Sequence, residues 1–217
     1  MSAELIVIIL SHRGWWKTPV EKNTREAFRR SFERGWGAEL DVRDFQGQLV
    51  VSHDPPRDNS FPFDDLLAIY TETACKGMLA INIKADGLQT LVAEALARHG
   101  IESYFVFDMS IPDALGYLKA GLIAFTRQSE YEPQPAFLEQ AGGVWLDAFH
   151  GAWADDAVIE RHLAVGRPVA LVSPELHKRP HLDDWAAWRD LASRADGGDL
   201  LMLCTDFPDE AERFFHG

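Results

Sequence analysis

Short apolar runs recur along the whole chain, and most of them precede a stretch with helical periodicity. Consecutive apolar residues in such short runs are typical of strands buried on both faces of a parallel sheet. A closed (β/α)₈ barrel needs eight such units, and 217 residues suffice for one. We therefore predict one α/β domain over residues 1–217, folded as a (β/α)₈ barrel. The eight runs are 5–10, 38–42, 78–83, 104–107, 122–125, 143–146, 168–172 and 200–204.

The segments between the runs carry the signals of helix starts and ends. Asn23, with Glu26 three residues later, predicts an N-cap for the first helix, and Gly35 lies at its C-terminal end. Ser110 followed by Pro112 predicts the start of another helix. Further helices are predicted over 87–99, 133–141, 155–164, 182–195 and 208–215.

The connection after the second run differs from the others. It reads RDFQGQLVVSHD, in which Gly47 predicts a turn between two extended pieces. We therefore expect a short hairpin extension after the second strand that ends at His53. The segment 55–63 is then expected to be a loop.

The composition narrows the possible partners. Lys and Arg total 21 and Asp and Glu total 34, which gives a net charge of −13. Nucleic acids and anionic membranes bind positive surfaces, so this balance argues against both. The apolar run 5–10 is too short to span a membrane, and no basic segment precedes it. We therefore interpret it as a buried strand and expect a cytoplasmic protein.

Two carboxylates on the second run carry the strongest chemical signal. Glu39 and Asp41 are two positions apart on a strand, so both side chains point to one face. Adjacent buried carboxylates repel each other, and a hard divalent cation resolves that conflict. The alternative is a structural role in which Arg or Lys pairs with them. In (β/α)₈ barrels the active site lies at the C-terminal ends of the strands, where both residues are expected.

Other polar residues follow the remaining runs at the same end. Asn82 and Lys84 share one face of the third strand, and Arg127 and Glu175 follow the fifth and seventh runs. Three aspartates each precede a predicted helix or turn, so that helix capping and a role in the site stay equally open for them. They are Asp108, Asp147 and Asp206.

Two of the eight histidines lie at strand ends beside charged residues. His12 and His53 are placed to remove a proton from an attacking oxygen and to deliver one to a leaving oxygen. His150 and His177 are weaker candidates at the same end of the barrel. The other four, which lie on or beside predicted helices, show no partner pattern.

Four ordered motifs resemble a known family. SHRG at 11–14, EKNTREAF at 21–28, AELDVRDFQGQLVVSHD at 38–54 and CTDFPDEA at 204–211 are similar to the signature of the glycerophosphodiester phosphodiesterases. This family belongs to the superfamily of phosphodiesterases similar to phosphatidylinositol-specific phospholipase C. The resemblance implies a (β/α)₈ barrel, with His12 and His53 as acid and base. It also implies that Glu39 and Asp41 bind a divalent metal.

The resemblance also assigns the phosphate-binding residues. Arg13 and Lys84 would hold the phosphate, and Arg127 and Glu175 are the further residues we expect around the substrate. The third metal ligand of the family is usually a carboxylate two residues before the lysine, a position that Asn82 occupies here. An amide oxygen still ligates Mg²⁺ or Ca²⁺, but with one negative charge fewer.

We therefore expect a phosphoric diester hydrolase that binds Mg²⁺ or Ca²⁺, with Mn²⁺ as a further option. It would cleave a small phosphodiester to an alcohol and a glycerol phosphate or cyclic phosphate. One alternative is a phosphotransferase or lyase acting on a polyol-phosphate polymer with the same residues. Another is a catalytically weak barrel that binds a phosphorylated metabolite. The sequence predicts neither the headgroup nor the oligomeric state.

Overall fold

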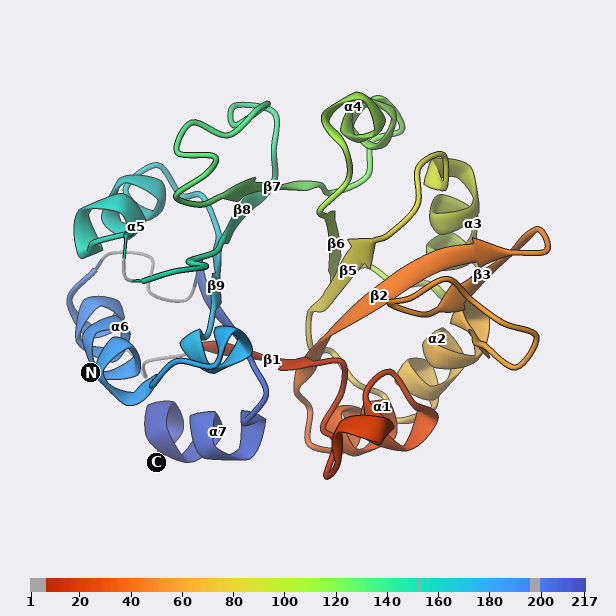
Figure 1. The fold of residues 1–217 in the computed structure, drawn as a ribbon, viewed down its shortest axis with the longest axis horizontal. Helices are drawn as coiled ribbons and strands as arrows, with labels where there is room; N and C mark the ends of the chain where they lie inside the picture. Colours follow the sequence, from red (N-terminus) through yellow and green to blue (C-terminus); the bar gives the residue numbers. More distant parts are fainter. Residues whose placement is uncertain (1–6, 152, 196–199) are drawn as a thin grey trace.

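A computed structural model describes residues 7–151, 153–195 and 200–217, and shows strands arranged in a ring with helices outside them (Figure 1). The strands are β1 (Ile8–His12), β2 (Gly37–Phe45), β3 (Gln48–Val51), β4 (Phe61–Pro62), β5 (Leu79–Ile83), β6 (Tyr104–Phe107), β7 (Phe125–Gln128), β8 (Gly143–Leu146), β9 (Val169–Val172) and β10 (Leu201–Thr205). The α-helices are α1 (Arg25–Glu33), α2 (Phe63–Glu72), α3 (Gln89–His99), α4 (Ile111–Lys119), α5 (Asp156–Leu163), α6 (Leu182–Arg194) and α7 (Pro208–His216).

Eight of these strands pair in parallel, as the apolar runs predicted. β1 pairs with both β2 and β10, so the first and last strands of the ring are neighbours. From β2 the ladder continues through β5 to β6, and from β10 it continues through β9 and β8 to β7. Residues 5 and 6 of the first predicted run lie outside the described residues.

The ladder is interrupted between β6 and β7. Only an isolated parallel bridge, between Val106 and Ala124, connects these strands within the described part of the chain. Inside the ring, the rings of Phe105 and Phe125 stack across the interruption with centroids 3.9 Å apart. The expectation that all eight strands close into a continuous sheet is therefore wrong at this seam, where aromatic packing takes over from hydrogen bonding.

The predicted hairpin extension is confirmed. β2 pairs with β3 in antiparallel register through a two-residue turn at Gln46 and Gly47. Both turn residues have positive φ, 50° and 79°, as a type I′ turn requires. β3 pairs in turn with β4, and this pairing holds the 52–60 connection close to the hairpin.

Two helices differ from expectation. The segment 133–141 is not a helix but forms a single turn in which Ala141 N donates to Phe137 O. Pro133 and Pro135 explain this, because the residue before a proline is disfavoured in helical conformation. Conversely, α2 follows the short loop at 52–60, in a segment for which the sequence analysis predicted no helix. Five of its side chains are buried at helical spacing: Phe63, Leu66, Leu67, Ile69 and Tyr70.

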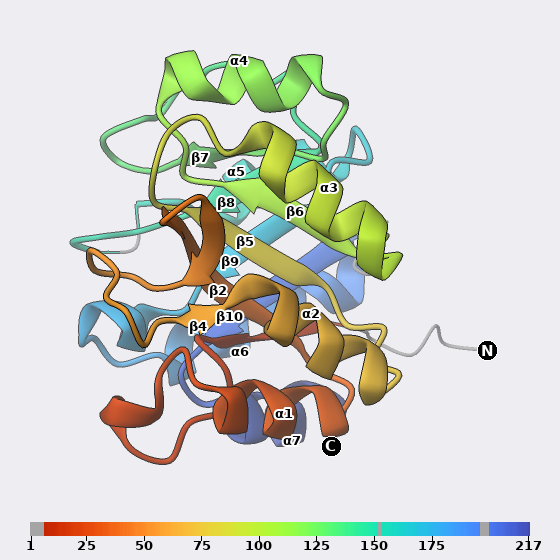
Figure 2. The same ribbon diagram turned by 90° about the vertical axis from the view of Figure 1, so that its right-hand side faces the viewer.

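Three apolar clusters stabilise the fold. One lies inside the ring and contains residues such as Leu10, Ala80 and Cys204. A second lies between the strands and α1 to α4, which cover one side of the ring in Figure 2, and a third lies under α5 to α7. Within the described part of the chain, no helix combines the length and the apolar character that crossing a membrane requires.

Candidate active site

Strand register brings the predicted metal ligands together at the C-terminal end of the ring. His12 on β1 is the register partner of Glu39 on β2, and Asp41 is the partner of Asn82 on β5. Glu39 and Asp41 point to the same face of β2 because side chains alternate along a strand. Only 2% of Glu39, 0% of Asp41 and 7% of Asn82 is exposed to solvent.

Each of these three residues has a buried oxygen that accepts no hydrogen bond from the described residues. These atoms are Glu39 Oε2, Asp41 Oδ1 and Asn82 Oδ1. The Asn82 amide fixes its own orientation by donating from Nδ2 to Glu39 Oε1 at 3.3 Å. Buried oxygens without a donor are costly, and a hard divalent cation takes this kind of ligand. The residues present therefore fit a divalent metal, although no described group of three or more His, Cys, Asp or Glu residues forms a metal cluster.

The electrostatics of Glu39 agree with that fit. Burial, followed by repulsion from Asp41, raises the pKa of Glu39 to about 8. Without a cation, Glu39 therefore holds a proton at neutral pH. The hydrogen bond from Asn82 and the charges of Arg13 and Lys84 oppose this rise without overcoming it.

The two residues predicted to bind phosphate, Arg13 and Lys84, both lie beside Asp41. Arg13 Nε is 2.8 Å from Asp41 Oδ2, and Lys84 Nζ is 3.4 Å from Asp41 Oδ1. Lys84 Nζ also lies 3.6 Å from Asp108 Oδ2 at the end of β6. Asp108 does not cap α4, whose N-cap is Ser110, and it contacts candidate site residues instead.

The backbone of 11–14 explains why this turn contains a glycine. Arg13 has a left-handed φ of 59° and Gly14 one of 84°. A Cβ at Gly14 would lie 2.7 to 2.9 Å from backbone and side-chain atoms of Ala27 and Phe28. Only glycine allows α1 to approach the turn this closely, and the approach holds Arg13 beside Asp41.

His12 is oriented by an aspartate from the other end of the chain. Its Nδ1 lies 2.6 Å from Asp206 Oδ1, and Lys22 Nζ donates to the same carboxylate at 3.1 and 3.2 Å. Burial lowers the pKa of His12 and outweighs the opposing effect of Asp206. Burial would raise the pKa of Asp206, but the hydrogen bond and charge of His12, with Lys22, lower it. His12 is therefore neutral near pH 7, with Nε2 available to accept a proton.

Asn23 has a different role from the predicted one. The cap of α1 is Thr24, whose side chain accepts a hydrogen bond from Ala27 N. Asn23 has a left-handed φ of 60° and donates from Nδ2 to Asp41 Oδ2 at 2.9 Å. The motif that signalled a helix start thus also supplies a residue that positions Asp41, a candidate metal ligand.

The remaining predicted site residues lie apart from the metal ligands. His53 is half-exposed on the hairpin extension, with Nδ1 2.9 Å from Asp54, and among the described residues no hydrogen bond or ion pair joins it to His12. Glu175 accepts hydrogen bonds from Thr205, Ser173 and the Asp206 backbone. Through these bonds it holds the end of β10.

Arg127 is fixed between two carboxylates. Its Nη1 lies 2.7 Å from Asp108 Oδ1 and its Nε 2.6 Å from Glu132 Oε2. Burial would lower the pKa of Arg127, but these two carboxylates raise it. Asp108 therefore links Lys84 to Arg127, so charged contacts continue along the mouth from β5 to β7.

The structure adds residues that the sequence analysis had not placed in the site. Asp206 contacts His12, and Lys22 contacts Asp206. Asp206 lies too far from both residues in the sequence for spacing to predict these contacts. A second histidine–aspartate pair joins the ends of β8 and β9, where His177 Nε2 lies 2.7 Å from Asp147 Oδ1. Of the two weaker histidine candidates, His177 is therefore the one with a carboxylate partner.

Solved structures show which proteins share this fold. A glycerophosphodiester phosphodiesterase from Agrobacterium tumefaciens str. C58 is 19% identical, with a TM-score of 0.68 over 98% of this chain and 100% of its own. An Oleispira antarctica phosphodiesterase in complex with the product sn-glycerol-3-phosphate is 16% identical, with a TM-score of 0.70 over 97% of both chains. A Ca²⁺-dependent phosphatidylinositol-specific phospholipase C from Streptomyces antibioticus is 13% identical, with a TM-score of 0.57 over 96% of this chain and 95% of its own.

The chain matches no protein-family model and no curated protein by sequence. The structural likeness nevertheless confirms the fold that the motif resemblance implied. Because (β/α)₈ barrels carry many chemistries, the activity has to be argued from the side chains of the site.

Proposed function

We propose that this protein is a divalent-metal-dependent phosphodiesterase acting on small diesters of the glycerophosphodiester type. One observation carries the proposal: three buried oxygens that accept no hydrogen bond from the described residues lie beside a neutral histidine and the cationic side chains of Arg13 and Lys84. The fold likeness to two phosphodiesterases, one of which holds glycerol phosphate as product, supports the same chemistry.

Glu39 Oε2, Asp41 Oδ1 and Asn82 Oδ1 would hold the metal, for which Mg²⁺ or Ca²⁺ is the expected ion. Once bound, such a cation polarises phosphoryl oxygens and lowers the pKa of an attacking hydroxyl. The two carboxylates and the amide supply the oxygen ligands that both ions prefer. The Streptomyces neighbour, which shares the fold, is Ca²⁺ dependent, and this supports a divalent cation as the cofactor.

Arg13 and Lys84 would bind the phosphate that bridges the two alcohols. Both already lie beside Asp41, so a phosphate next to that carboxylate meets them at short range. Fixed cations of this kind stabilise the negative charge that builds on phosphoryl oxygens in the transition state. Asp108, in contact with Lys84, keeps the amine at the mouth of the ring.

His12 is the proposed general base. Asp206 accepts a hydrogen bond from Nδ1–H of His12, which leaves the lone pair of Nε2 for the proton of the attacking oxygen. The lowered pKa of His12 keeps that lone pair free at neutral pH. His53, at the end of the hairpin, is the proposed donor of a proton to the leaving alcohol.

A metal-dependent turnover assay tests the proposal. Glycerophosphodiesters should be cleaved in the presence of Mg²⁺, Ca²⁺ or Mn²⁺ and should be stable in a chelator. Phosphorus NMR of the products separates hydrolysis from release of a cyclic phosphate or transfer to an added polyol. Binding of glycerol phosphate without turnover of any diester would contradict the proposal and support the non-catalytic barrel.

Asn82 provides a second test of the metal site. Replacing it by aspartate should tighten metal binding on the order of tenfold, because cation affinity rises with carboxylate count. Turnover should not rise in proportion, since extra negative charge offsets the Lewis acidity of the ion. Isothermal calorimetry with Ca²⁺ measures the affinity directly. Asn59→Asp, which adds the same charge on an exposed loop, is the control, and equal affinities for all three proteins would exclude Asn82 as a ligand.

A further inference from the structure

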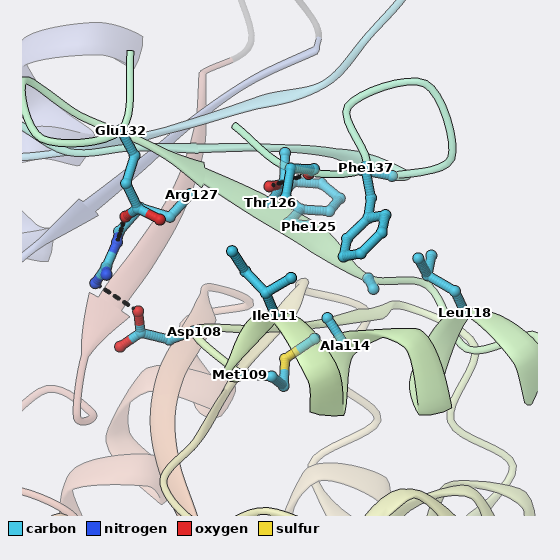
Figure 3. Close-up of a pocket in the computed structure, with 13 residues that line it drawn as sticks. Asp108, Met109, Ile111, Ala114, Leu118, Phe125, Thr126, Arg127, Glu132 and Phe137 are labelled. Carbon is cyan, nitrogen blue, oxygen red and sulfur yellow. Dashed lines mark hydrogen bonds and ion pairs between the residues drawn. The ribbon is translucent and has the colours of Figure 1, made fainter. Parts of the chain in front are cut away.

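A cavity of about 60 Å³ lies beside the interrupted ladder, between α4 and the connection from β7 to β8 (Figure 3). Most of its wall is apolar and comes from Met109, Ile111, Ala114, Leu118, Ala124, Phe125, Ala136, Phe137 and Ala141. It exists because residues 133–141 form a turn and not a helix, which leaves the outer face of β7 partly uncovered.

The entrance of the cavity adjoins the phosphate-binding residues. Asp108, Arg127 and Glu132 line one side of it in Figure 3, joined by the two ion pairs of Arg127. Lys84 Nζ is 3.6 Å from Asp108 Oδ2, so a single side chain separates the phosphate-binding lysine from the cavity. A group attached to a phosphate at Lys84 would therefore lie close to the entrance of the cavity.

The charged groups at this entrance are already paired. Arg127 is ion-paired with Asp108 and Glu132, and Lys84 lies between Asp108 and Asp41. A charged headgroup would have to break one of these pairs, whereas an uncharged group would not. The apolar wall beyond the entrance favours an aliphatic group for the same reason.

Resting on the proposed phosphodiesterase function, we propose that this cavity is a subsite for a short aliphatic group on the non-glycerol alcohol of the substrate. A cavity of about 150 Å³ accommodates benzene, so one of about 60 Å³ holds roughly two or three carbon atoms. The subsite would thus select diesters of small uncharged alcohols over those of charged headgroups or long chains.

A homologous series of substrates tests this subsite. The methyl, ethyl, propyl, butyl and hexyl esters of glycerol phosphate are compared as substrates of the full chain with its activating metal. Burial of each methylene contributes about 0.8 kcal/mol, or roughly fourfold in kcat/KM. We expect kcat/KM to rise roughly sixteenfold from methyl to propyl and to stop rising beyond it.

Filling the cavity should remove that preference. Ala114→Leu, from the α4 side, should make kcat/KM of the propyl and methyl esters equal within about twofold. Ala136→Leu repeats the test from the opposite wall, in case the first variant fails to fold. Ala120→Leu, exposed at the end of α4 and outside the cavity, is the matched control and should keep the wild-type preference.

The outcomes separate this subsite from the activity on which it rests. Cleavage of all esters at similar rates by the wild type would mean that the cavity is a packing void only, while the phosphodiesterase activity stands. A rise that continues to the hexyl ester would also overturn the subsite, because the chain would then bind elsewhere. Failure to cleave any diester would overturn the proposed function and the subsite with it.

Discussion

Replacing His12 by alanine is expected to lower turnover of a glycerophosphodiester by a factor on the order of 10² to 10⁴, the usual contribution of a positioned acid or base. His12 is the one predicted catalytic histidine that contacts both a site carboxylate and an orienting aspartate: Nε2 lies 3.9 Å from Glu39 and Nδ1 2.6 Å from Asp206. Loss of the imidazole leaves Asp206 paired with Lys22, so the fold should be retained. Single-turnover kinetics at saturating metal, together with thermal unfolding, measure both effects.

Asp206→Asn tests how strongly the activity of His12 depends on its hydrogen bond to Asp206. It should reduce turnover less than loss of His12 and shift the acidic limb of the pH–rate profile, because the carboxylate raises the proton affinity of His12. A profile unchanged in shape would remove Asp206 from the proton transfer. In the double variant the two effects should not add, since both act through one imidazole.

His53→Ala is expected to lower turnover by a similar factor if His53 delivers the proton to the leaving alcohol. Its half-exposed position means that the substitution should leave stability unchanged. Full activity of this variant would assign the proton donor to another group. His177, held by Asp147 at the opposite part of the mouth, is then the next histidine to replace.

Metal binding should be strongly pH-dependent. The pKa of Glu39 is raised from 4.5 to about 8 by burial and by Asp41. Between those pH values the folded protein keeps a proton that the unfolded chain has released, so the free energy of unfolding of the metal-free protein falls as pH rises through this window. A divalent cation must displace that proton. Its apparent affinity should therefore rise up to about tenfold per pH unit below the pKa of Glu39.

The thermal midpoint at pH 6 and pH 9, with chelator and with Ca²⁺, measures this coupling. Stabilisation by Ca²⁺ should be small at pH 6 and large at pH 9. Glu39→Gln removes the titrating group, so the variant should be more stable than wild type at pH 9 without metal and should gain little from Ca²⁺. Glu94→Gln, on the exposed face of α3, is the matched control. Equal stabilisation at both pH values would place the cation elsewhere.

The sequence predicted the strands better than the connections. Apolar runs identify buried parallel strands because both faces must be covered, and each of the eight runs overlaps a strand of the ring, although the run 122–125 meets β7 only at Phe125. The helix predicted at 133–141 is absent because Pro133 and Pro135 disfavour helical conformation at the residues before them. The break between β6 and β7 depends on how aromatic side chains pack inside the ring, which no local pattern encodes.

In the site as well, residues on predicted strands were easier to assign than residues whose contacts join distant parts of the chain. Glu39, Asp41 and Asn82 follow from alternation along neighbouring strands, and the structure brings them into contact with Arg13, Lys84 or each other. Asp206 could not be assigned beyond a choice between cap and site, because its partner His12 lies 194 positions away. Asn23 was mistaken for a cap because the side chain of its neighbour Thr24 performs that task.

The His12–Asp206 pair spans the junction between the first and last strands of the ring. During synthesis the ribosome releases β1 and its metal-binding neighbours long before β10, and N-terminal segments are the first able to fold. Until β10 pairs with β1, Asp206 cannot contact His12 in the nascent chain. The orientation of His12 by Asp206 is thus established only when β10 has paired with β1, so the proposed general base reaches its final geometry after both ends of the ring are in place.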